Sequence, residues 1–227
     1  MYPRVGWWTA QSIEWFVRAS EASSYHRELS DKIANLLFPC KSVLELGCGL
    51  GYEAELLYEK GFAVKALDDN KDVIDIAKKR SGLDIFYCED AKKTKDAADA
   101  LLCINYGHLS DIFELSDLFS HAAMRLVYII SRHNGHGTDT REDRTEKNRK
   151  LMKESSFDFS ESSLSLDFDQ PLASMEEAKA FIDFTYLGKN SQSYLGFVEK
   201  TDNSTYPFVF RNRKELSVFV LNKRSNK

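Results

Sequence analysis

Apolar residues in the first forty positions recur at intervals of three and four residues. This interval is typical of one face of an α-helix, and a proline such as Pro39 interrupts a helix. The pattern predicts two amphipathic helices that end at Pro39 and form an N-terminal helical extension over residues 1–40. The positions that carry it are Ile13, Phe16 and Val17, followed by Leu29, Ile33, Leu36 and Leu37.

From Ser42 the pattern changes to short apolar runs separated by helical stretches. Runs that are apolar throughout are typical of strands buried on both faces, and strand–helix alternation indicates parallel crossover connections. We therefore predict an α/β fold with a doubly wound, mostly parallel sheet. The strand-like runs are SVLEL, FAVKAL, DIFY, ALLCI and LVYII, and helical stretches lie near 52–60, 70–80 and 110–123.

Two segments follow these runs with different patterns. Residues 138–156 carry charges of both signs and few apolar positions, which predicts a solvated helix or a mobile segment. Ser174 and Glu177 have the spacing of a capping box, which predicts a helix after Pro171. The inner face of that helix would carry Ala178, Phe181, Ile182 and Phe184.

Two further apolar runs, YPFVF and ELSVFVL, are joined near the C-terminus by the polar RNRK. Apolar runs flanking a short polar segment predict an antiparallel hairpin. We expect residues 41–227 to form one domain that this hairpin closes, because 227 residues suit one α/β domain with additions.

Composition narrows the possible partners. The formal net charge is -4, with 35 acidic and 31 basic residues interspersed, so neither nucleic acid nor an anionic membrane is indicated as the main partner. No apolar run is long enough to span a bilayer, and the first residues lack the pattern of a secretory signal. We expect a cytoplasmic protein that acts on a small molecule, with its oligomeric state left open.

The four cysteines, Cys40, Cys48, Cys88 and Cys103, contain no CxxC pair and lie in or beside apolar segments. This spacing disfavours a zinc site and a disulfide framework. Reduced thiols in a cytosol are therefore the expectation.

The segment VLELGCGLGYEAELL, residues 43–57, places Gly47, Gly49 and Gly51 between a predicted strand and a predicted helix. Glycine allows positive φ and a close approach of a ligand to the backbone, and the following helix presents unpaired N–H groups. The dinucleotide fingerprint is GxGxxG, whereas Tyr52 follows the third glycine of a GxGxG pattern here. The turn predicts a ligand cradle in which a pyrophosphate is disfavoured.

ELGCGLG, from Glu45 to Gly51, resembles the first motif of class I S-adenosylmethionine-dependent methyltransferases, and the resemblance continues through about residues 42–130. It implies a Rossmann-like, mostly parallel seven-stranded sheet and S-adenosylmethionine as the cofactor. It also implies that Glu45 orients the cofactor's amino group, directly or through water. The backbone of Gly47, Cys48 and Gly49 would then pass against the methionine and the ribose.

Two further acids follow the next strands. Asp68 closes FAVKALD, 17 residues after Gly51, where a carboxylate can accept both ribose hydroxyls in a bidentate pair. Asp69 beside it is interpreted as a helix cap or a solvated acid. Asp90 in CEDA is similar to the family's acid that binds the adenine amino group, and the resemblance makes the N–H of Ala91 available to the ring.

The fourth strand ends in CINYGH, residues 103–108. Loops at the carboxyl ends of parallel strands surround ligands, so Asn105 is a candidate cofactor contact and Tyr106 a candidate substrate contact. The [DN]PP[YF] signature of methyltransferases that act on adenine in nucleic acids is missing from this position. Its absence disfavours nucleic-acid amino groups as acceptors.

Histidine is the natural general base for a hydroxyl or protonated amine acceptor. His108 follows the fourth strand and His133 follows the fifth, so these are the candidate catalytic residues; a loop histidine without a role is the alternative for each. His136 forms HxxH with His133, but no further clustered ligands support a metal site.

The extension is rich in aromatic residues, including Trp7, Trp15 and Tyr25. One interpretation is a lid whose rings pack against the sulfonium or the acceptor, with Tyr25 and His26 as candidate substrate contacts. The other is that these rings pack the extension onto the sheet.

Together these patterns predict an S-adenosylmethionine-dependent methyltransferase that acts on an oxygen or nitrogen of a small molecule. An RNA or protein methyltransferase and a non-catalytic S-adenosylmethionine-binding subunit stay open as alternatives. A dehydrogenase is the third alternative. The acceptor itself is not encoded in a recognisable motif.

Overall fold

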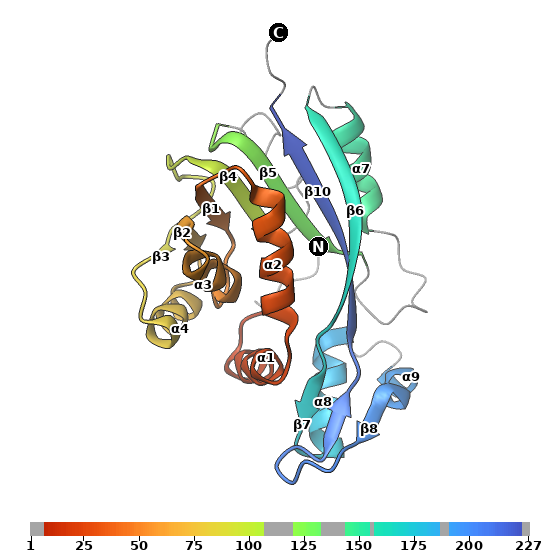
Figure 1. Cartoon of the computed structure of the whole chain (residues 1–227). Helices are drawn as coiled ribbons and strands as arrows, with labels where there is room; N and C mark the ends of the chain where they lie inside the picture. Colours follow the sequence, from red (N-terminus) through yellow and green to blue (C-terminus); the bar gives the residue numbers. More distant parts are fainter. Residues whose placement is uncertain (1–6, 107–119, 133–143, 155–156, 187–190, 224–227) are drawn as a thin grey trace. The chain divides into compact units, whose positions relative to one another are not determined.

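The computed structural model describes residues 7–106, 120–132, 144–154, 157–186 and 191–223 (Figure 1). The chain divides into two compact units. The sheet unit contains His26–Arg132, Glu142–Leu164 and Glu215–Lys227, and the small unit contains Met1–Tyr25, His133–Arg141 and Ser165–Lys214. These units do not follow the boundary expected near residue 40, and the division into an extension and a domain stays a prediction.

A seven-stranded sheet with the order β3-β2-β1-β4-β5-β10-β6 organises the sheet unit. The pairs β1–β2, β2–β3, β1–β4 and β4–β5 are parallel, whereas β10 is antiparallel to β5. The predicted doubly wound, mostly parallel sheet is therefore confirmed. The strands are β1 Ser42–Leu46, β2 Ala63–Asp68, β3 Phe86–Cys88, β4 Ala98–Ile104, β5 Ala122–Ser131, β6 Asp158–Asp167 and β10 Arg213–Asn222.

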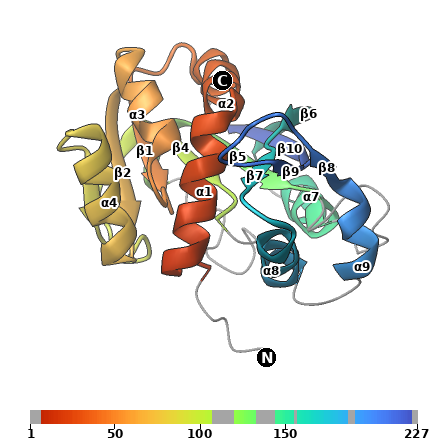
Figure 2. The ribbon, with the colours of Figure 1, turned by 90° about the horizontal axis from the view of Figure 1, so that it is seen from below.

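Helices α3 Tyr52–Glu59 and α4 Lys71–Ser81 pack against the strands β2 and β3, and α7 Arg144–Glu154 packs against β5 (Figures 1 and 2). Helix α2, Tyr25–Leu37, precedes β1. The helix expected near 110–123 falls largely on residues 107–119, which lie outside the described part of the chain. Coverage by helices accounts for the continuous apolar character of the strands, in which Leu44, Leu101 and Tyr128 are almost fully buried.

The strand order reverses direction at β1. The chain runs outward from β1 through β2 to β3, and it then returns to place β4 on the other side of β1. Ligands of open α/β sheets bind outside the carboxyl ends of the strands at this kind of reversal. The loop that follows β1 is the glycine turn, so the topology puts that turn at the expected binding position.

Helix α7 lies within residues 138–156, where a solvated helix or a mobile segment was expected, and one face of this helix is buried rather than solvated. Its residues Thr145, Asn148 and Met152 are all fully buried, at helical spacing. The amide Nδ2 of Asn148 donates a hydrogen bond to the hydroxyl of Tyr128 on β5, over 3.3 Å. Two of the three buried positions are polar, so the hydrophobic pattern could not reveal this face.

The small unit is built on a three-stranded antiparallel sheet with the order β7-β9-β8. Helices α1 and α8 both pack against β7 (Figure 2). Its apolar cluster includes Trp15, Phe181, Ile182 and Phe210. The elements are α1 Ala10–Ala22, β7 Gln170–Leu172, α8 Met175–Tyr186, α9 Ser191–Tyr194, a 3₁₀ turn Leu195–Phe197, β8 Val198–Lys200 and β9 Phe208–Phe210.

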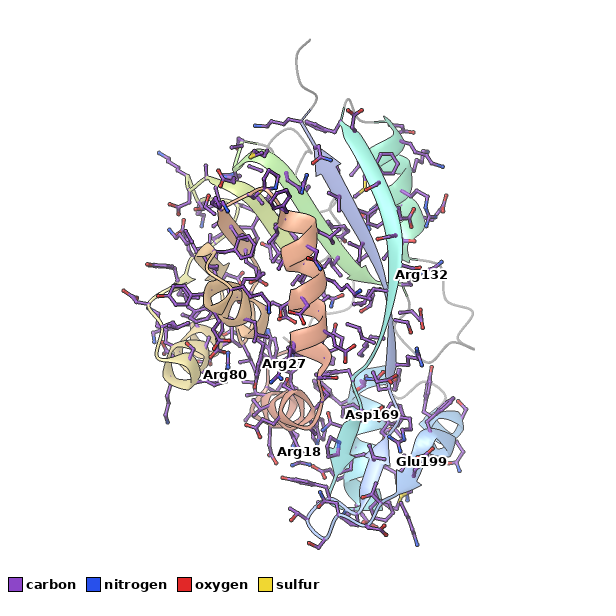
Figure 3. All side chains as sticks on the ribbon, in the orientation of Figure 1. Arg18, Arg27, Arg80, Arg132, Asp169 and Glu199 are labelled. Carbon is purple, nitrogen blue, oxygen red and sulfur yellow. The ribbon has the colours of Figure 1, made fainter. Side chains whose placement is uncertain are left out.

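The predicted start of α8 is confirmed. The backbone N–H of Glu177 donates to Oγ of Ser174 over 3.1 Å. The Glu177 carboxylate does more than cap the helix, because it also accepts from Nε1 of Trp15 and pairs with Arg18 on α1, which is labelled in Figure 3. The inner face expected for this helix is present, with Ala178, Phe181 and Ile182 buried and Phe184 partly buried against the same cluster.

Antiparallel strands do form near the C-terminus, but the two apolar runs do not pair with each other. β9 pairs with β7 and β8, whereas β10 pairs with β5. Phe210 belongs to the core of the small unit, and Phe219 belongs to the core of the sheet unit. The expectation of a hairpin was wrong in its pairing, because each run packs into a different core.

Among the residues that the structure describes, no helix has both the length and the apolar character that crossing a membrane requires.

Candidate functional site

The glycine turn between β1 and α3 depends on its glycines. Gly47, Gly49 and Gly51 have φ values of 69°, 53° and 74°, the left-handed region that favours glycine. A Cβ at Gly47 would lie 2.0 Å from Cδ2 of Tyr106, and a Cβ at Gly51 would lie 2.2 Å from Cε1 of Phe86. The rings of Tyr106 and Phe86 therefore pack against the two ends of the turn. A residue larger than glycine at position 47 or 51 would collide with them.

The end of β2 holds the turn in place. Asp68 Oδ2 accepts from the backbone N–H of Gly49 over 2.9 Å, and its Oδ1 accepts from the N–H of Asn70 over 2.9 Å. The N–H of Cys48 donates to the carbonyl of Leu67. Burial raises the pKa of Asp68 above its ordinary value, against the effect of these two hydrogen bonds. The carboxylate predicted to bind ribose is thus present at the turn and already helps to shape it.

A basic residue that the sequence analysis missed also supports the turn. Arg80, at the end of α4, donates to the carbonyl of Leu50 over 3.2 Å and pairs with Glu55 (Figure 3). Its guanidinium lies over the ring of Tyr52, 3.9 Å from the ring centre. A basic residue in the last turn of a helix is ordinarily explained by the helix dipole. Nothing in the sequence therefore distinguished Arg80 from its neighbours.

Three carboxyl groups gather behind the turn. Glu45 on β1 is 2% exposed, and its Oε2 is buried with no hydrogen-bond partner in the described part of the chain. Burial raises the pKa of Glu45 well above its ordinary value, and the nearby Glu53 and Asp68 raise it further. A buried acid beside two others is unfavourable in the free protein. A cation placed there would relieve it.

His26 lies beside this group. Its Nδ1 is 2.6 Å from Oε1 of Glu53, and its ring stacks on Tyr52 with the ring centres 4.5 Å apart. These contacts join α2 to α3. Tyr25, the preceding residue, belongs to the small unit and packs on Phe168 with the ring centres 4.7 Å apart. Substrate contact by Tyr25 and His26 stays a prediction.

Asp90 and Ala91 follow β3, whose end is in parallel register with Asp68. The Asp90 carboxylate accepts from the N–H of Lys92 over 3.0 Å and pairs with the Lys93 ammonium over 3.3 Å. The hydrogen bond from Lys92 and then the pairing with Lys93 lower the pKa of Asp90. Asp90 is therefore an ionised acceptor at the same edge of the sheet as Asp68.

Asn105 and Tyr106 complete this edge after β4. Asn105 has a φ of 51°, and its Oδ1 accepts from the N–H and the hydroxyl of Ser131 over 2.9 and 3.1 Å. The side chain thus ties the end of β4 to β5. Burial, followed by the Cys103 thiol and the Asp69, Asp90 and Asp68 carboxylates, raises the pKa of Tyr106 to about 12.

The candidate bases His108 and His133 lie outside the described residues. Among those that are described, no group of three or more histidine, cysteine, aspartate and glutamate side chains has an arrangement that could hold a metal ion.

Comparison with known proteins supplies the next observation. The family model described as "Tellurite resistance protein TehB" matches residues 8–108. None of the curated proteins matches the sequence. Among solved structures, magnesium protoporphyrin IX methyltransferase (ChlM) from Synechocystis PCC 6803 with bound S-adenosylmethionine has 13% identity and a TM-score of 0.51, and the match covers 87% of this chain and 80% of that one.

Two other structures have the same fold. A Bacillus halodurans protein, provisionally assigned as a methyltransferase, has 15% identity and a TM-score of 0.54, over 86% of this chain and 99% of its own. The plantazolicin methyltransferase BpumL, in complex with S-adenosylhomocysteine, has 12% identity and a TM-score of 0.51, over 95% and 91%. The chain therefore has the fold of these methyltransferases.

The side chains around the glycine turn fit S-adenosylmethionine, the molecule bound in the ChlM structure. S-adenosylmethionine carries an ammonium and a sulfonium, and Glu45 offers a buried carboxyl oxygen without a partner among the described residues. The left-handed turn at Gly47 and Gly49 leaves no Cβ between the backbone and a ligand. The carboxylates of Asp68 and Asp90 suit hydroxyl and amino donors.

Proposed function

We propose that this protein is an S-adenosylmethionine-dependent methyltransferase that transfers the methyl group to an oxygen or nitrogen of a small molecule. The observation that carries the proposal is the charge around Tyr106. Asp68, Asp69 and Asp90 all act on its hydroxyl, and within the described residues only Asp90 has a basic side chain in an ion pair with it. A nucleic acid would bring phosphates into this negative field, which is unfavourable. A neutral or cationic small molecule meets no such repulsion.

We assign the cofactor contacts by the chemistry of each group. Glu45 would hold the ammonium of the methionine part, since its oxygen without a partner among the described residues can accept and a cation beside it would favour the ionised form. The backbone at Gly47, Cys48, Gly49 and Gly51 would follow the methionine and ribose.

The nucleoside part would meet the acids that end the next strands. Asp68 would accept the ribose hydroxyls, because each carboxylate oxygen has about two lone-pair sites and only one is used by a backbone N–H. Asp90 and the N–H of Ala91 would meet the adenine.

Asn105 and Tyr106 would act on the acceptor side of the site. Asn105 is a positioning residue in this proposal, since Ser131 already occupies its side-chain oxygen and the pair fixes the loop after β4. The Tyr106 phenol, with its pKa raised to about 12, stays protonated at neutral pH and is a hydrogen-bond donor rather than a base. His108 and His133 are the proposed proton acceptors when the methyl acceptor is a hydroxyl or an ammonium.

The cofactor supplies an electrophilic methyl group on a sulfonium, a good leaving group. The protein would orient the acceptor and exclude water. Orientation of this kind can lower the activation free energy by roughly 7–11 kcal/mol. A rigid edge made by Asp68, Asn105 and the glycine turn suits that role.

Glu45→Gln tests the cofactor site without damaging the fold. Removing a charge-assisted partner costs about 1.5–3 kcal/mol, so binding of S-adenosylhomocysteine in calorimetry should weaken roughly 10- to 100-fold. The stability of the free variant should not fall, because an amide of the same shape replaces a carboxyl group whose ionised form is unfavourable at this buried position. The exposed Glu59→Gln on α3 is the matched control and should bind as the parent does. Unchanged affinity in Glu45→Gln would overturn the assignment.

The acceptor class is tested by turnover. The enzyme is incubated with S-adenosylmethionine labelled in the methyl group and with separated metabolite, RNA and protein fractions of a cell extract. Label in the metabolite fraction supports the proposal. Label in RNA or protein alone, or formation of S-adenosylhomocysteine with no acceptor in any fraction, contradicts it.

A further inference from the structure

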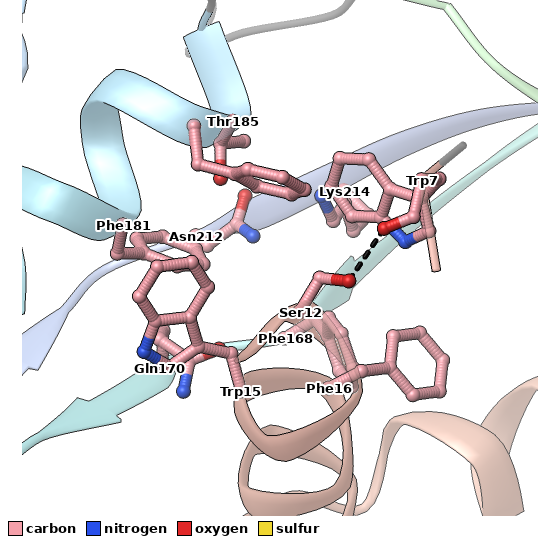
Figure 4. Close-up of a pocket in the computed structure, with 11 residues that line it drawn as sticks. Trp7, Ser12, Trp15, Phe16, Phe168, Gln170, Phe181, Thr185, Asn212 and Lys214 are labelled. Carbon is pink, nitrogen blue, oxygen red and sulfur yellow. Dashed lines mark hydrogen bonds between the residues drawn. The ribbon is translucent and has the colours of Figure 1, made fainter. Parts of the chain in front are cut away.

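The small unit contains a cavity of about 50 Å³ that the proposed function does not use (Figure 4). By the measure in which one water fills roughly 10–15 Å³, it has room for a few waters or for one small chemical group. Every residue that lines it belongs to the small unit. The lining consists of Trp7, Ser12, Trp15, Phe16, Phe168, Gln170, Phe181, Phe184, Thr185, Asn212 and Lys214.

Most of the cavity wall is aromatic and held in place. Trp15 donates from Nε1 to Glu177 over 3.0 Å, and its ring packs edge-on against Phe181 with the ring centres 5.4 Å apart. Trp7 lies 5.2 Å from Phe184 between ring centres, and its carbonyl accepts from Ser12, as the dashed line in Figure 4 shows. A wall of this kind favours an apolar body.

Three polar side chains line the same cavity as these rings. Thr185 comes from α8, Asn212 precedes β10 and Lys214 lies on β10 (Figure 4). The hydroxyl oxygen of Thr185 is buried and has no partner in the described part of the chain. Lys214, Asn212 and Thr185 all carry hydrogen-bond donors, and none of the described residues that line the cavity is acidic. These three donors therefore have no negatively charged acceptor among the described residues of the cavity wall.

The electrostatics of Lys214 also indicate that a negatively charged partner is missing. Burial among these neighbours lowers the pKa of Lys214 from 10.5 to about 8, and no charged group counters the effect. The ammonium is therefore charged at neutral pH while lacking a counter-ion among the described residues. Such a charge is stabilised when an anion is brought to it.

We propose that this cavity binds the apolar end of a small carboxylic acid, with Lys214 pairing to the carboxylate and the aromatic rings enclosing the hydrocarbon. Thr185 and Asn212 supply the remaining hydrogen bonds. The site goes beyond the proposed methyl transfer, because nothing in the argument depends on the cofactor or on which atom is methylated.

Hexanoate is the probe and hexanamide its neutral counterpart. Both are titrated into the full-length protein at pH 7 by calorimetry and by tryptophan fluorescence, since two of the three tryptophans line the cavity. Hexanoate should bind at least about tenfold more tightly than hexanamide, in line with a charge-assisted hydrogen bond. Binding should weaken by about tenfold at pH 9.5, because Lys214 loses its charge above its pKa of about 8 and no other described residue of the cavity lining titrates in this range.

Three variants separate the anion site from general effects. Lys214→Met should lose the preference for hexanoate, and Lys214→Arg should retain it. The exposed Lys200→Met on β8 is the matched control and should bind as the parent does. Equal binding of acid and amide, retained preference in Lys214→Met, or no binding of hexanoate at millimolar concentration would each overturn the proposal. Glu45→Gln should bind hexanoate as the parent does. This result would show that the cavity and the proposed cofactor site are separate.

Discussion

Replacing Gly51 with alanine should destabilise the protein by more than the backbone conformation alone explains. Gly51 precedes α3 with a φ of 74°, in the left-handed region. Holding an alanine there costs about 1–2 kcal/mol. The new Cβ would also lie 2.2 Å from Cε1 of Phe86, whose ring is fully buried. Overpacking of this kind adds about 1–3 kcal/mol.

Gly82→Ala is the control that isolates the second contribution. Gly82 ends α4 with a φ of 70°, yet a Cβ there would meet nothing within 4 Å. Its substitution should therefore cost only the backbone part, about 1–2 kcal/mol. The loss of chain entropy in the unfolded state affects both variants alike and cancels in the comparison.

Urea unfolding at pH 7 measures both variants. We expect the free energy of unfolding to fall by about 2–5 kcal/mol in Gly51→Ala, the sum of the strain and the overlap. The double variant Gly51→Ala with Phe86→Leu should recover part of the loss, because the two side chains collide directly. Equal losses at Gly51 and Gly82, or no coupling to Phe86, would refute the argument that ring packing requires glycine at this turn.

Three further predictions rest on other parts of the structure. Lys214→Met should raise the free energy of unfolding at pH 7 by about 1–3 kcal/mol, because the folded protein holds the ammonium in an apolar site and each pH unit of pKa change is worth about 1.4 kcal/mol. The gain should shrink as the pH rises from 8 to 10.5, where the lysine loses its proton in the unfolded chain as well, and a gain independent of pH in urea titrations would contradict the assigned cause. Asn105→Ala should cost about 2–4 kcal/mol, from two lost hydrogen bonds to Ser131 and a left-handed φ; Asn105→Gly should cost less in the same measurement, since glycine accepts that φ. Alkylation followed by mass spectrometry should label Cys88 in the native protein, with the other cysteines protected until urea unfolds the chain, because only Cys88 is exposed; rapid native labelling of a second cysteine would be inconsistent with this burial. The protected cysteines are Cys40, Cys48 and Cys103.

Local signals led to the elements that surround the turn. The runs SVLEL and FAVKAL match β1 and β2 to within a residue, because strands covered on both faces must be apolar along their length. The three glycines, and Asp68 at the end of β2, were identifiable since their roles depend on backbone conformation and on position at the end of a strand. The capping pair Ser174 and Glu177 is likewise a contact across three residues.

Contacts between segments that are distant in the sequence could not be predicted from such local patterns. Arg80 meets the glycine turn from the far end of α4, and His26 meets Glu53 across 27 positions of the chain. The buried face of α7 carries Thr145 and Asn148, whose polarity suggested solvent.

The sequence by itself thus predicted the strands and helices next to the glycine turn and the sharp bend after β1, all of which are expressed through neighbouring residues. Tertiary structure alone decided that β9 and β10 enter different sheets, that Glu45 is left with an unpartnered oxygen among the described residues, and that Lys214 stands among aromatic rings. The physical reason is that partner choice and desolvation depend on which distant surfaces are brought together, and the free energy of those contacts has no local period or spacing in the chain.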